Sequence, residues 1–285
     1  MKNGKHKLGT GPVLKLTLIG AGLMAVAVFA AEPNRPTPLP QAHAHNDYEH
    51  SRPLLDALDH GFCSVEADVW LVDGQLLVGH DLKDIKSGRT LQSLYLDPLR
   101  ARVEKNGGQV FRDGPPFTLL VDVKSDATNT YLALRSALRP FEKMLTKFHP
   151  DKTETNAITV ILSGNRARGL MAAETNRLAA YDGRLADLDS DGSRHFIPLI
   201  SDNWSLHFKW RARKEEGPLP KAERTQLRNL VARTHGQGRR LRLWGTPDSP
   251  EMWAELREAG VDLINTDNLP GRRDFLAARH GDSQK

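Results

Sequence analysis

The chain has one cysteine, Cys63, in 285 residues, so it cannot form an internal disulfide. Cys63 lies in an apolar run and is expected to pack as a small core residue. The sequence also lacks a P-loop, a G-x-S-x-G elbow, a C-x-x-C pair and an H-E-x-x-H motif. These absences leave no motif-based case for a P-loop nucleotide hydrolase, an elbow-type serine hydrolase or a zincin. No internal repeat is found.

Residues 1–30 contain no acidic residue and are predicted to be a signal peptide. A basic start precedes Leu16 to Phe29, an apolar run too short for a confident membrane span. The run ends in small residues, so cleavage is expected after Ala30, with an uncleaved anchor as the alternative. No cysteine follows it, which argues against a lipoprotein anchor. The protein is therefore expected to be secreted or periplasmic.

Removal of that segment would also lower the net charge of the protein. The whole chain carries a formal net charge of +5, but four of its lysines lie in residues 1–30, and the remainder carries about +1. This balance gives no case for nucleic-acid binding. Residues 31–40 are a proline-rich leader, and residues 41–280 have the length of one large domain.

Strand-like and helix-like stretches alternate along residues 41–280. The expected strands are Leu39–His45, Cys63–Trp70, Phe117–Lys124, Ala157–Ser163, Leu178–Asp182, Phe196–Ser201, Arg240–Trp244 and Asp262–Thr266. The expected helices are Pro53–Asp59, Leu91–Lys105, Thr130–Phe148, Arg166–Arg177, Lys221–Thr234 and Pro250–Ala259. Residues 76–78 read as a short β-extension after an Asp-Gly turn. This alternation predicts an α/β fold, a single (β/α)8 TIM barrel.

Two carboxylates on one strand are the first candidate site. Glu66 and Asp68 are two residues apart in the alternating stretch VEADVW, so their side chains share one face. Like charges placed so close favour a hard divalent cation between them, Mg²⁺ or Ca²⁺. His45 precedes the pair and His80 follows it, and histidines beside such an ion indicate an acid and a base.

Other polar residues also stand where expected strands end. Asp122 and Lys124 end the third strand on one face, Trp244 ends the seventh, and Asp267 follows the eighth. In a (β/α)8 barrel, chemistry gathers at the C-terminal ends of the strands. The sequence therefore places these candidates at one mouth of the barrel.

These residues resemble the PLC-like phosphodiesterase superfamily, which includes glycerophosphodiester phosphodiesterases and the venom type of phospholipase D. HAHNDYEH at 43–50 and GVDLINTD at 260–267 are similar to the group named for altered inheritance of mitochondria protein 6. The resemblance implies a metal-dependent phosphoric diester hydrolase acting on a glycerophosphodiester or a phospholipid. The roles it implies are catalysis by His45 and His80, metal binding by Glu66, Asp68 and Asp122, and substrate binding by Lys124 and Trp244.

The resemblance has departures. The glycerophosphodiesterases usually carry His-Arg-Gly where this chain has His45 followed by Asn46 and Asp47, and they often use Glu in place of Asp122. His43 is an alternative for the place given to His45. Depth in the barrel favours His45, with Asn46 and Asp47 expected to fix its tautomer.

Weaker predictions concern three further residues. Asp81 either orients an imidazole or caps the following turn. Asn203 and Trp204, in a loop rich in aromatics, either line an apolar rim that binds substrate or cover a barrel end. Such a rim implies transient contact with a membrane surface, and no protein partner is implied.

Two rival functions remain open at the sequence level. His43 and His45 form an H-x-H pair which, with Asp267, fits a metal-dependent amidohydrolase or phosphoesterase. The other rival is a non-catalytic ligand-binding barrel, because fold alone does not decide function.

Overall fold

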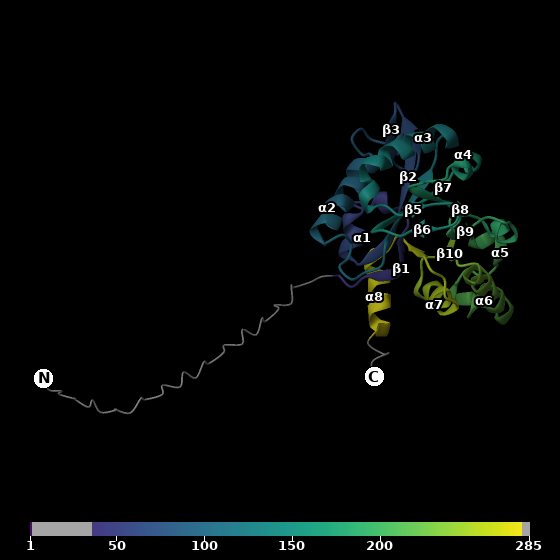
Figure 1. Ribbon diagram of the computed structural model, residues 1–285. Helices are drawn as coiled ribbons and strands as arrows, with labels where there is room; N and C mark the ends of the chain where they lie inside the picture. The colour runs from purple at the N-terminus through teal and green to yellow at the C-terminus, as the bar shows by residue number, and fades with distance from the viewer. Residues whose placement is uncertain (2–35, 281–285) are drawn as a thin grey trace. The chain divides into compact units, whose positions relative to one another are not determined.

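The structure is a computed structural model that describes residues 1 and 36–280. Eight parallel strands form a nearly closed (β/α)8 barrel, in the spatial order β10-β9-β8-β7-β4-β2-β1-β11 (Figure 1). Backbone amides of Asp262 and Leu263 donate to the Leu241 carbonyl and bring β11 back to β10. The predicted fold class is therefore confirmed. The barrel strands are β1 Leu39–Ala44, β2 Phe62–Val72, β4 Phe117–Val123, β7 Ile158–Gly164, β8 Ala179–Gly183, β9 Leu199–Asn203, β10 Arg240–Trp244 and β11 Ile264–Thr266.

Each predicted barrel strand is present, with small differences at the ends. The largest shift is in β9, which begins at Leu199 rather than Phe196. Pro198 directly precedes it and has no N–H to donate to a ladder, so the regular pairing starts after it. The expected β-extension is β3 Gln75–Val78, which pairs antiparallel with β2.

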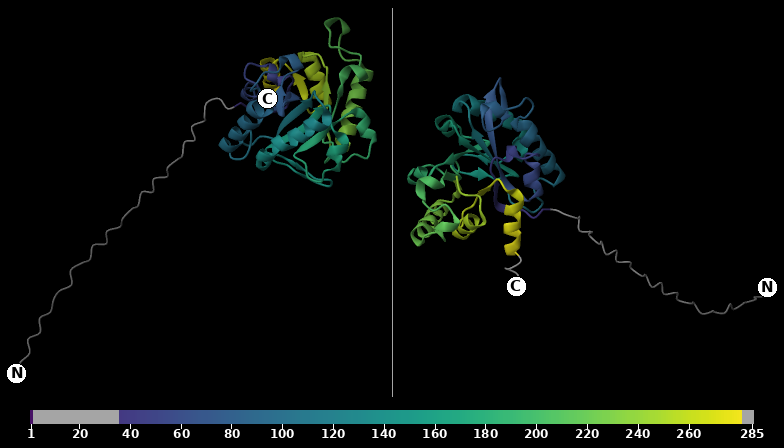
Figure 2. Two further views of the ribbon diagram at one scale, coloured as in Figure 1. Left: turned by 90° about the horizontal axis from the view of Figure 1, so that it is seen from above. Right: turned by 180° about the vertical axis from the view of Figure 1, so that it is seen from behind.

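The helices lie on the outside of the strands, and α8 runs beside β1 (Figures 1 and 2). The α-helices are α1 Leu55–Asp59, α2 Asp97–Lys105, α3 Ala127–Leu138, α4 Arg168–Ala173, α5 Trp204–His207, α6 Lys221–Gly236, α7 Pro250–Ala259 and α8 Leu269–His280. A π-helical turn, η3 Gln92–Leu96, precedes α2. The short 3₁₀ turns are η1 Asp47–Glu49, η2 Leu82–Asp84, η4 Arg139–Met144, η5 Leu185–Asp189 and η6 Lys214–Glu216.

The predicted helix Thr130–Phe148 is wrong in its second half. The α-helix ends at Leu138, and Pro140 at the start of η4 removes a backbone donor. The chain then forms a small antiparallel hairpin, β5 Lys147–Phe148 with β6 Thr153–Glu154, which the sequence did not indicate.

An apolar plug fills the middle of the barrel. Leu120, Ile161, Leu199 and Leu263 form a buried cluster of their own, separate from the main core between strands and helices. Two positions after each of these four residues, on the same face of β4, β7, β9 and β11, the side chain is polar: Asp122, Ser163, Ser201 and Asn265. The interior therefore changes from apolar to polar toward the C-terminal mouth.

The predicted signal peptide lies outside the described residues. Among the residues that are described, no helix is both long and apolar enough to cross a membrane.

Candidate active site

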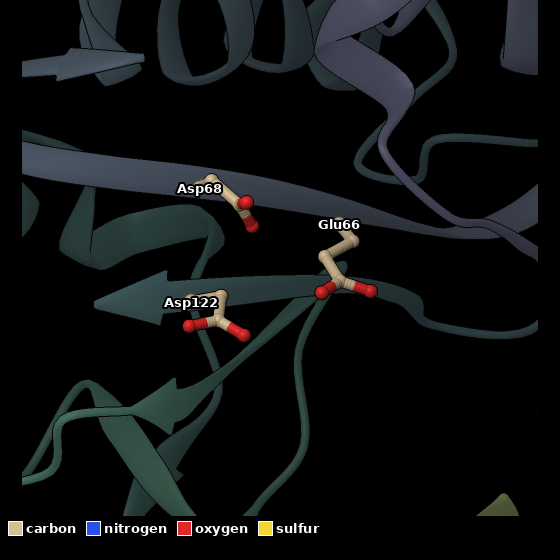
Figure 3. A group of neighbouring side chains, drawn as sticks. All are labelled: Glu66, Asp68 and Asp122. Atoms are coloured by element: carbon tan, nitrogen blue, oxygen red, sulfur yellow. The ribbon is translucent and has the colours of Figure 1, made fainter. Parts of the chain in front are cut away.

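Three carboxylates converge at the C-terminal mouth. Glu66 and Asp68 come from β2 and Asp122 from the neighbouring β4, where Asp68 and Asp122 are paired in register. One oxygen of each lies within 4.8 Å of the others. Figure 3 shows the three side chains turned toward a common space. The alternation of two parallel strands is thus enough to gather them.

The deepest carboxylate, Glu66, is held through one oxygen. Its Oε2 accepts hydrogen bonds from Nη2 of Arg242 and from Nε2 of His43 at 3.3 Å. Although burial disfavours its ionised form, Arg242 and His43 hold the pKa of Glu66 well below its ordinary value. Glu66 is therefore ionised, and its Oε1 remains for another ligand.

Asp68 is held in the same one-sided way. Its Oδ2 lies 2.7 Å from the Tyr48 hydroxyl, 2.9 Å from Nδ1 of His80 and 3.1 Å from Nζ of Lys124. Its Oδ1 is buried and has no hydrogen-bond partner within the part of the chain that the structure describes. Burial and the neighbouring Glu66 raise the pKa of Asp68. An unpartnered buried carboxylate oxygen is costly and fits a cation placed beside it.

Asp122 completes the set. Burial and the charge of Glu66 raise its pKa to about 6. Gly164, at φ +66°, lies so close that a Cβ there would stand 2.1 Å from Oδ1 of Asp122. Three oxygen ligands in a crowded acidic group are the donor type that Mg²⁺ and Ca²⁺ prefer. The residues present therefore fit a divalent cation held by Glu66, Asp68 and Asp122.

Two histidines flank the carboxylates, each held by a carboxylate of its own. Nδ1 of His45 donates to Oδ1 of Asp267 at 2.9 Å, and Nδ1 of His80 donates to Oδ2 of Asp68. No residue in the described ranges bonds to Nε2 of either ring, and both rings line the central pocket. Burial opposes protonation of His45, but the bond to Asp267 outweighs it and raises the pKa of His45.

His43 is different, because both of its ring nitrogens are used inside the barrel. It is fully buried, its Nδ1 lies 2.7 Å from the Ser64 hydroxyl, and its Nε2 faces Glu66. Burial and the nearby Arg242 lower its pKa to about 4. His43 is therefore a neutral group that positions Glu66, while His45 is the histidine at the mouth.

The expectation that Asn46 and Asp47 fix the tautomer of His45 is wrong. Asn46 lies against the Tyr48 hydroxyl at 2.8 Å. Asp47 is buried and accepts the amide of Leu54 at 2.5 Å. The residue that holds His45 is Asp267, more than two hundred positions away.

The mouth is a pocket of about 410 Å³. Lys124 and Trp244 line it as predicted. Burial lowers the pKa of Lys124, but the charges of Asp122 and Asp68 outweigh burial and raise it. Arg184 and Arg242 also line this pocket, and Arg242 was not predicted. Its lining residues are His45, Asn46, Glu66, Asp68, His80, Asp122, Val123, Lys124, Ser163, Gly164, Asn165, Arg184, Arg242 and Trp244.

Trp204, predicted to bind substrate, is a core residue. It is fully buried, stacks on Phe208 with ring centroids 4.0 Å apart, and donates from Nε1 to the Trp210 carbonyl at 2.8 Å. It has no exposed surface with which to contact a ligand, so that prediction is wrong.

The other two weaker candidates are capping residues. Asn203 does not line the pocket, and its side chain accepts the amide of Ser205 at 2.8 Å at the start of α5. Asp81 is exposed and caps η2, so the reading in which it orients an imidazole is wrong, and Asp68 holds His80 instead.

Comparisons with known proteins agree with this geometry. Residues 35–182 match the AIM6-like phosphodiesterase domain, and residues 240–270 match the glycerophosphoryl diester phosphodiesterase family. The chain is 33% identical over 275 residues to altered inheritance of mitochondria protein 6 of Lachancea thermotolerans, covering 81% of this chain and 64% of that protein. The namesake protein of Eremothecium gossypii is 30% identical over 265 residues, covering 81% and 68%. The chain thus spans about two thirds of the length of these relatives.

Solved structures show the same fold at low identity. A glycerophosphodiester phosphodiesterase from Parabacteroides distasonis superposes with a TM-score of 0.50 at 16% identity, over 84% of this chain and 98% of that one. One from Agrobacterium tumefaciens gives 0.50 at 14% identity, over 84% and 100%. From the domain match over half of its length, the chain belongs to the AIM6-like phosphodiesterase domain family.

Proposed function

We propose that this protein is an exported phosphoric diester hydrolase that uses a divalent cation, Mg²⁺ or Ca²⁺, and acts on a glycerophosphodiester or a phospholipid. One observation carries the proposal. Two histidines, each held at Nδ1 by a carboxylate, flank a trio of carboxylates in a single pocket. An acid, a base and an ion site together can catalyse cleavage of an anionic diester.

In this proposal the chain's own residues divide the work. A cation held by Glu66, Asp68 and Asp122 would supply charge stabilisation for a non-bridging phosphate oxygen. Lys124, whose ammonium lies 3.1 Å from Asp68 and 3.5 Å from Asp122, adds a point charge beside it. Trp244 supplies an apolar wall for the group attached to phosphorus.

The two histidines then move the protons. His45 takes one at Nε2 from the attacking hydroxyl, either of water or of the substrate, while Asp267 stabilises the imidazolium that results. His80 gives one from Nε2 to the leaving alkoxide, with Asp68 holding its ring. Because a carboxylate fixes each Nδ1, the catalytic nitrogen of both rings is Nε2.

The geometry does not favour the H-x-H metallohydrolase. That reading requires His43 and His45 to ligate one ion, but both nitrogens of His43 already face Ser64 and Glu66. His45 turns Nδ1 to Asp267. The pair therefore leaves no shared ligand position.

The test is a panel of phosphodiesters assayed with and without EDTA, with Mg²⁺ and Ca²⁺ added back separately. Glu66→Gln, Asp68→Asn and Asp122→Asn should each abolish both turnover and metal uptake while the far-ultraviolet circular dichroism stays unchanged. Glu174→Gln is a matched control, because Glu174 binds Tyr131 and Arg135 away from the pocket. Normal hydrolysis by all three variants, or no hydrolysis of any diester by the wild type, would refute the proposal.

Export and substrate contact are further parts of the proposal. A mature N-terminus near Ala31, read by mass spectrometry of secreted protein, supports the signal peptide. A mature chain that retains Lys2 argues against it. Small-molecule or lipid diesters are the proposed partners, with transient contact at a membrane surface and no nucleic acid.

A further inference from the structure

A second pocket lies at the opposite, N-terminal end of the barrel. Its volume is about 440 Å³, and it takes residues from the starts of the strands and from the β5–β6 hairpin. The apolar plug of Leu120, Ile161, Leu199 and Leu263 lies between this end and the polar residues of the active-site mouth. Its lining residues are Pro40, Gln41, Cys63, Pro115, Pro116, Thr118, Thr146, Phe148, Thr153, Thr155, Thr159, Pro198, Arg240 and Asp262.

Arg240 is the cation of this pocket. It lies two residues before Arg242 on β10, so it shares the inward face but sits at the other end of the barrel. Its Nη1 donates to the Thr118 hydroxyl at 3.2 Å. Within the described ranges no carboxylate lies within ion-pairing distance of it, whereas Arg242 is paired with Glu66.

The one acidic residue of the lining does not neutralise it. Oδ2 of Asp262 accepts the amide of Leu241 at 2.8 Å and faces Nε2 of His235 at 2.8 Å. A guanidinium has five N–H donors in a planar fork, and the one hydrogen bond described for Arg240 uses a single donor. Burial lowers the pKa of Arg240, and Asp262 opposes this only in part. The charge is therefore incompletely compensated.

The rest of the lining is apolar walls with a few hydroxyls. Four prolines supply the apolar surface, Phe148 is buried behind them, and threonine hydroxyls lie among them. The β5–β6 hairpin contributes Phe148 and Thr153 to this pocket. A concave, mostly apolar site with one fixed charge is the usual form of a small-molecule site.

We propose that this pocket binds a small organic anion with an apolar body. Its carboxylate or phosphate group pairs with the guanidinium of Arg240, and its body packs against the prolines. The site is independent of the proposed phosphodiesterase activity.

Isothermal titration of the full protein tests the anion. Benzoate and phenyl phosphate are the two anionic probes, and benzamide is the neutral match for benzoate. We expect both anions or one of them to bind and benzamide to bind at least about tenfold more weakly, because a hydrogen bond to a charged group is lost. Benzoate alone identifies a carboxylate site, and phenyl phosphate alone identifies a phosphate site. No binding of either anion, or equal binding of benzamide, would overturn the proposal.

Variants locate the binding. Arg240→Gln should weaken the anion at least about tenfold. Arg228→Gln, which removes an exposed arginine of α6, should bind as the wild type does. Glu66→Gln should also bind normally, because it alters only the active-site mouth. If Arg240→Gln does not fold, Arg240→Lys replaces it, and a loss of at least about threefold is expected because the planar fork is gone.

Binding that survives in Arg240→Gln places the anion elsewhere and overturns the proposal.

Discussion

Replacement of Tyr48 by Phe is the sharpest test of how the proposed metal site is built. The Tyr48 hydroxyl lies 2.7 Å from Oδ2 of Asp68, and the side chain is almost fully buried. Phe keeps the ring and its packing and removes only the hydroxyl. Asp68 keeps its other two partners on the same oxygen, His80 and Lys124.

The expected size of the effect follows from those contacts. A hydrogen bond to a charged group contributes about 1.5–3 kcal/mol. Two partners remain on Oδ2, so the lower end applies, and about 1.4 kcal/mol corresponds to a tenfold change in affinity. Loss of a hydrogen bond behind a metal ligand typically costs roughly 10- to 100-fold. Tyr48→Phe should therefore raise the dissociation constant of the divalent cation about tenfold.

The measurement is a metal titration of the EDTA-treated protein, by calorimetry and by activity on the best diester of the panel. Tyr131→Phe is the matched control. Tyr131 is on α3, away from the pocket, and its hydroxyl also donates to a carboxylate, that of Glu174 at 3.0 Å. Metal affinity within about twofold of wild type in Tyr48→Phe, or an equal loss in Tyr131→Phe, would refute the reasoning.

Two further predictions concern catalysis and stability. His45→Ala and His80→Ala should each lose at least about 10²-fold in kcat and keep bound metal. His43→Ala should lose clearly less turnover but should weaken metal binding, because His43 holds Glu66. Metal lost from His43→Ala and His45→Ala, with His80→Ala near wild type, would contradict this. Burial raises the pKa of Asp47 to about 7. The folded protein therefore keeps a proton that the unfolded chain releases near pH 4. As the pH rises from about 4 to about 7, the free energy of unfolding should fall by ~1.4 kcal/mol for each pH unit. In urea unfolding the fall should be less steep in Asp47→Asn, where Asp68 and Asp122 still contribute to it, and equal slopes for the two proteins would count against the prediction.

The strands could be predicted because each barrel strand has a clear apolar pattern bounded by turn residues. The β5–β6 hairpin could not, since its strands are two residues each and show no alternation. Pro140 was the available signal that the helix from Thr130 ends early.

At the site, the sequence predicts what a single strand determines. Glu66 and Asp68 share a face by the period of two, and Asp122 joins them by register with β2. Partners that are far away in the sequence lie beyond such reasoning. Arg242 meets Glu66 over 176 residues, and Asp267 meets His45 over 222. The one local sign of Arg242 is its position two residues before Trp244, on the same face.

Trp204 shows the opposite failure. Aromatic residues in a loop have the same composition whether they line a rim or fill the space under it, and burial is a tertiary property. Trp204 fills the space, stacked on Phe208. Composition alone therefore identifies an aromatic loop without saying which of its rings a ligand can reach.

The charges of the three carboxylates are compensated unequally, and this inequality points to the role of the ion. Arg242 is fixed in the barrel and lowers the pKa of Glu66, so the deepest ligand is ionised by the protein itself. Among the described residues no arginine is paired with Asp68 or Asp122. Their pKa values are raised, and for Asp122 burial and Glu66 outweigh the opposing charge of Arg242. Lys124 lies between those two and is partly exposed. Asp68 and Asp122 therefore still require a positive charge. They lie nearest the mouth of the barrel, where a divalent cation and a phosphate would meet.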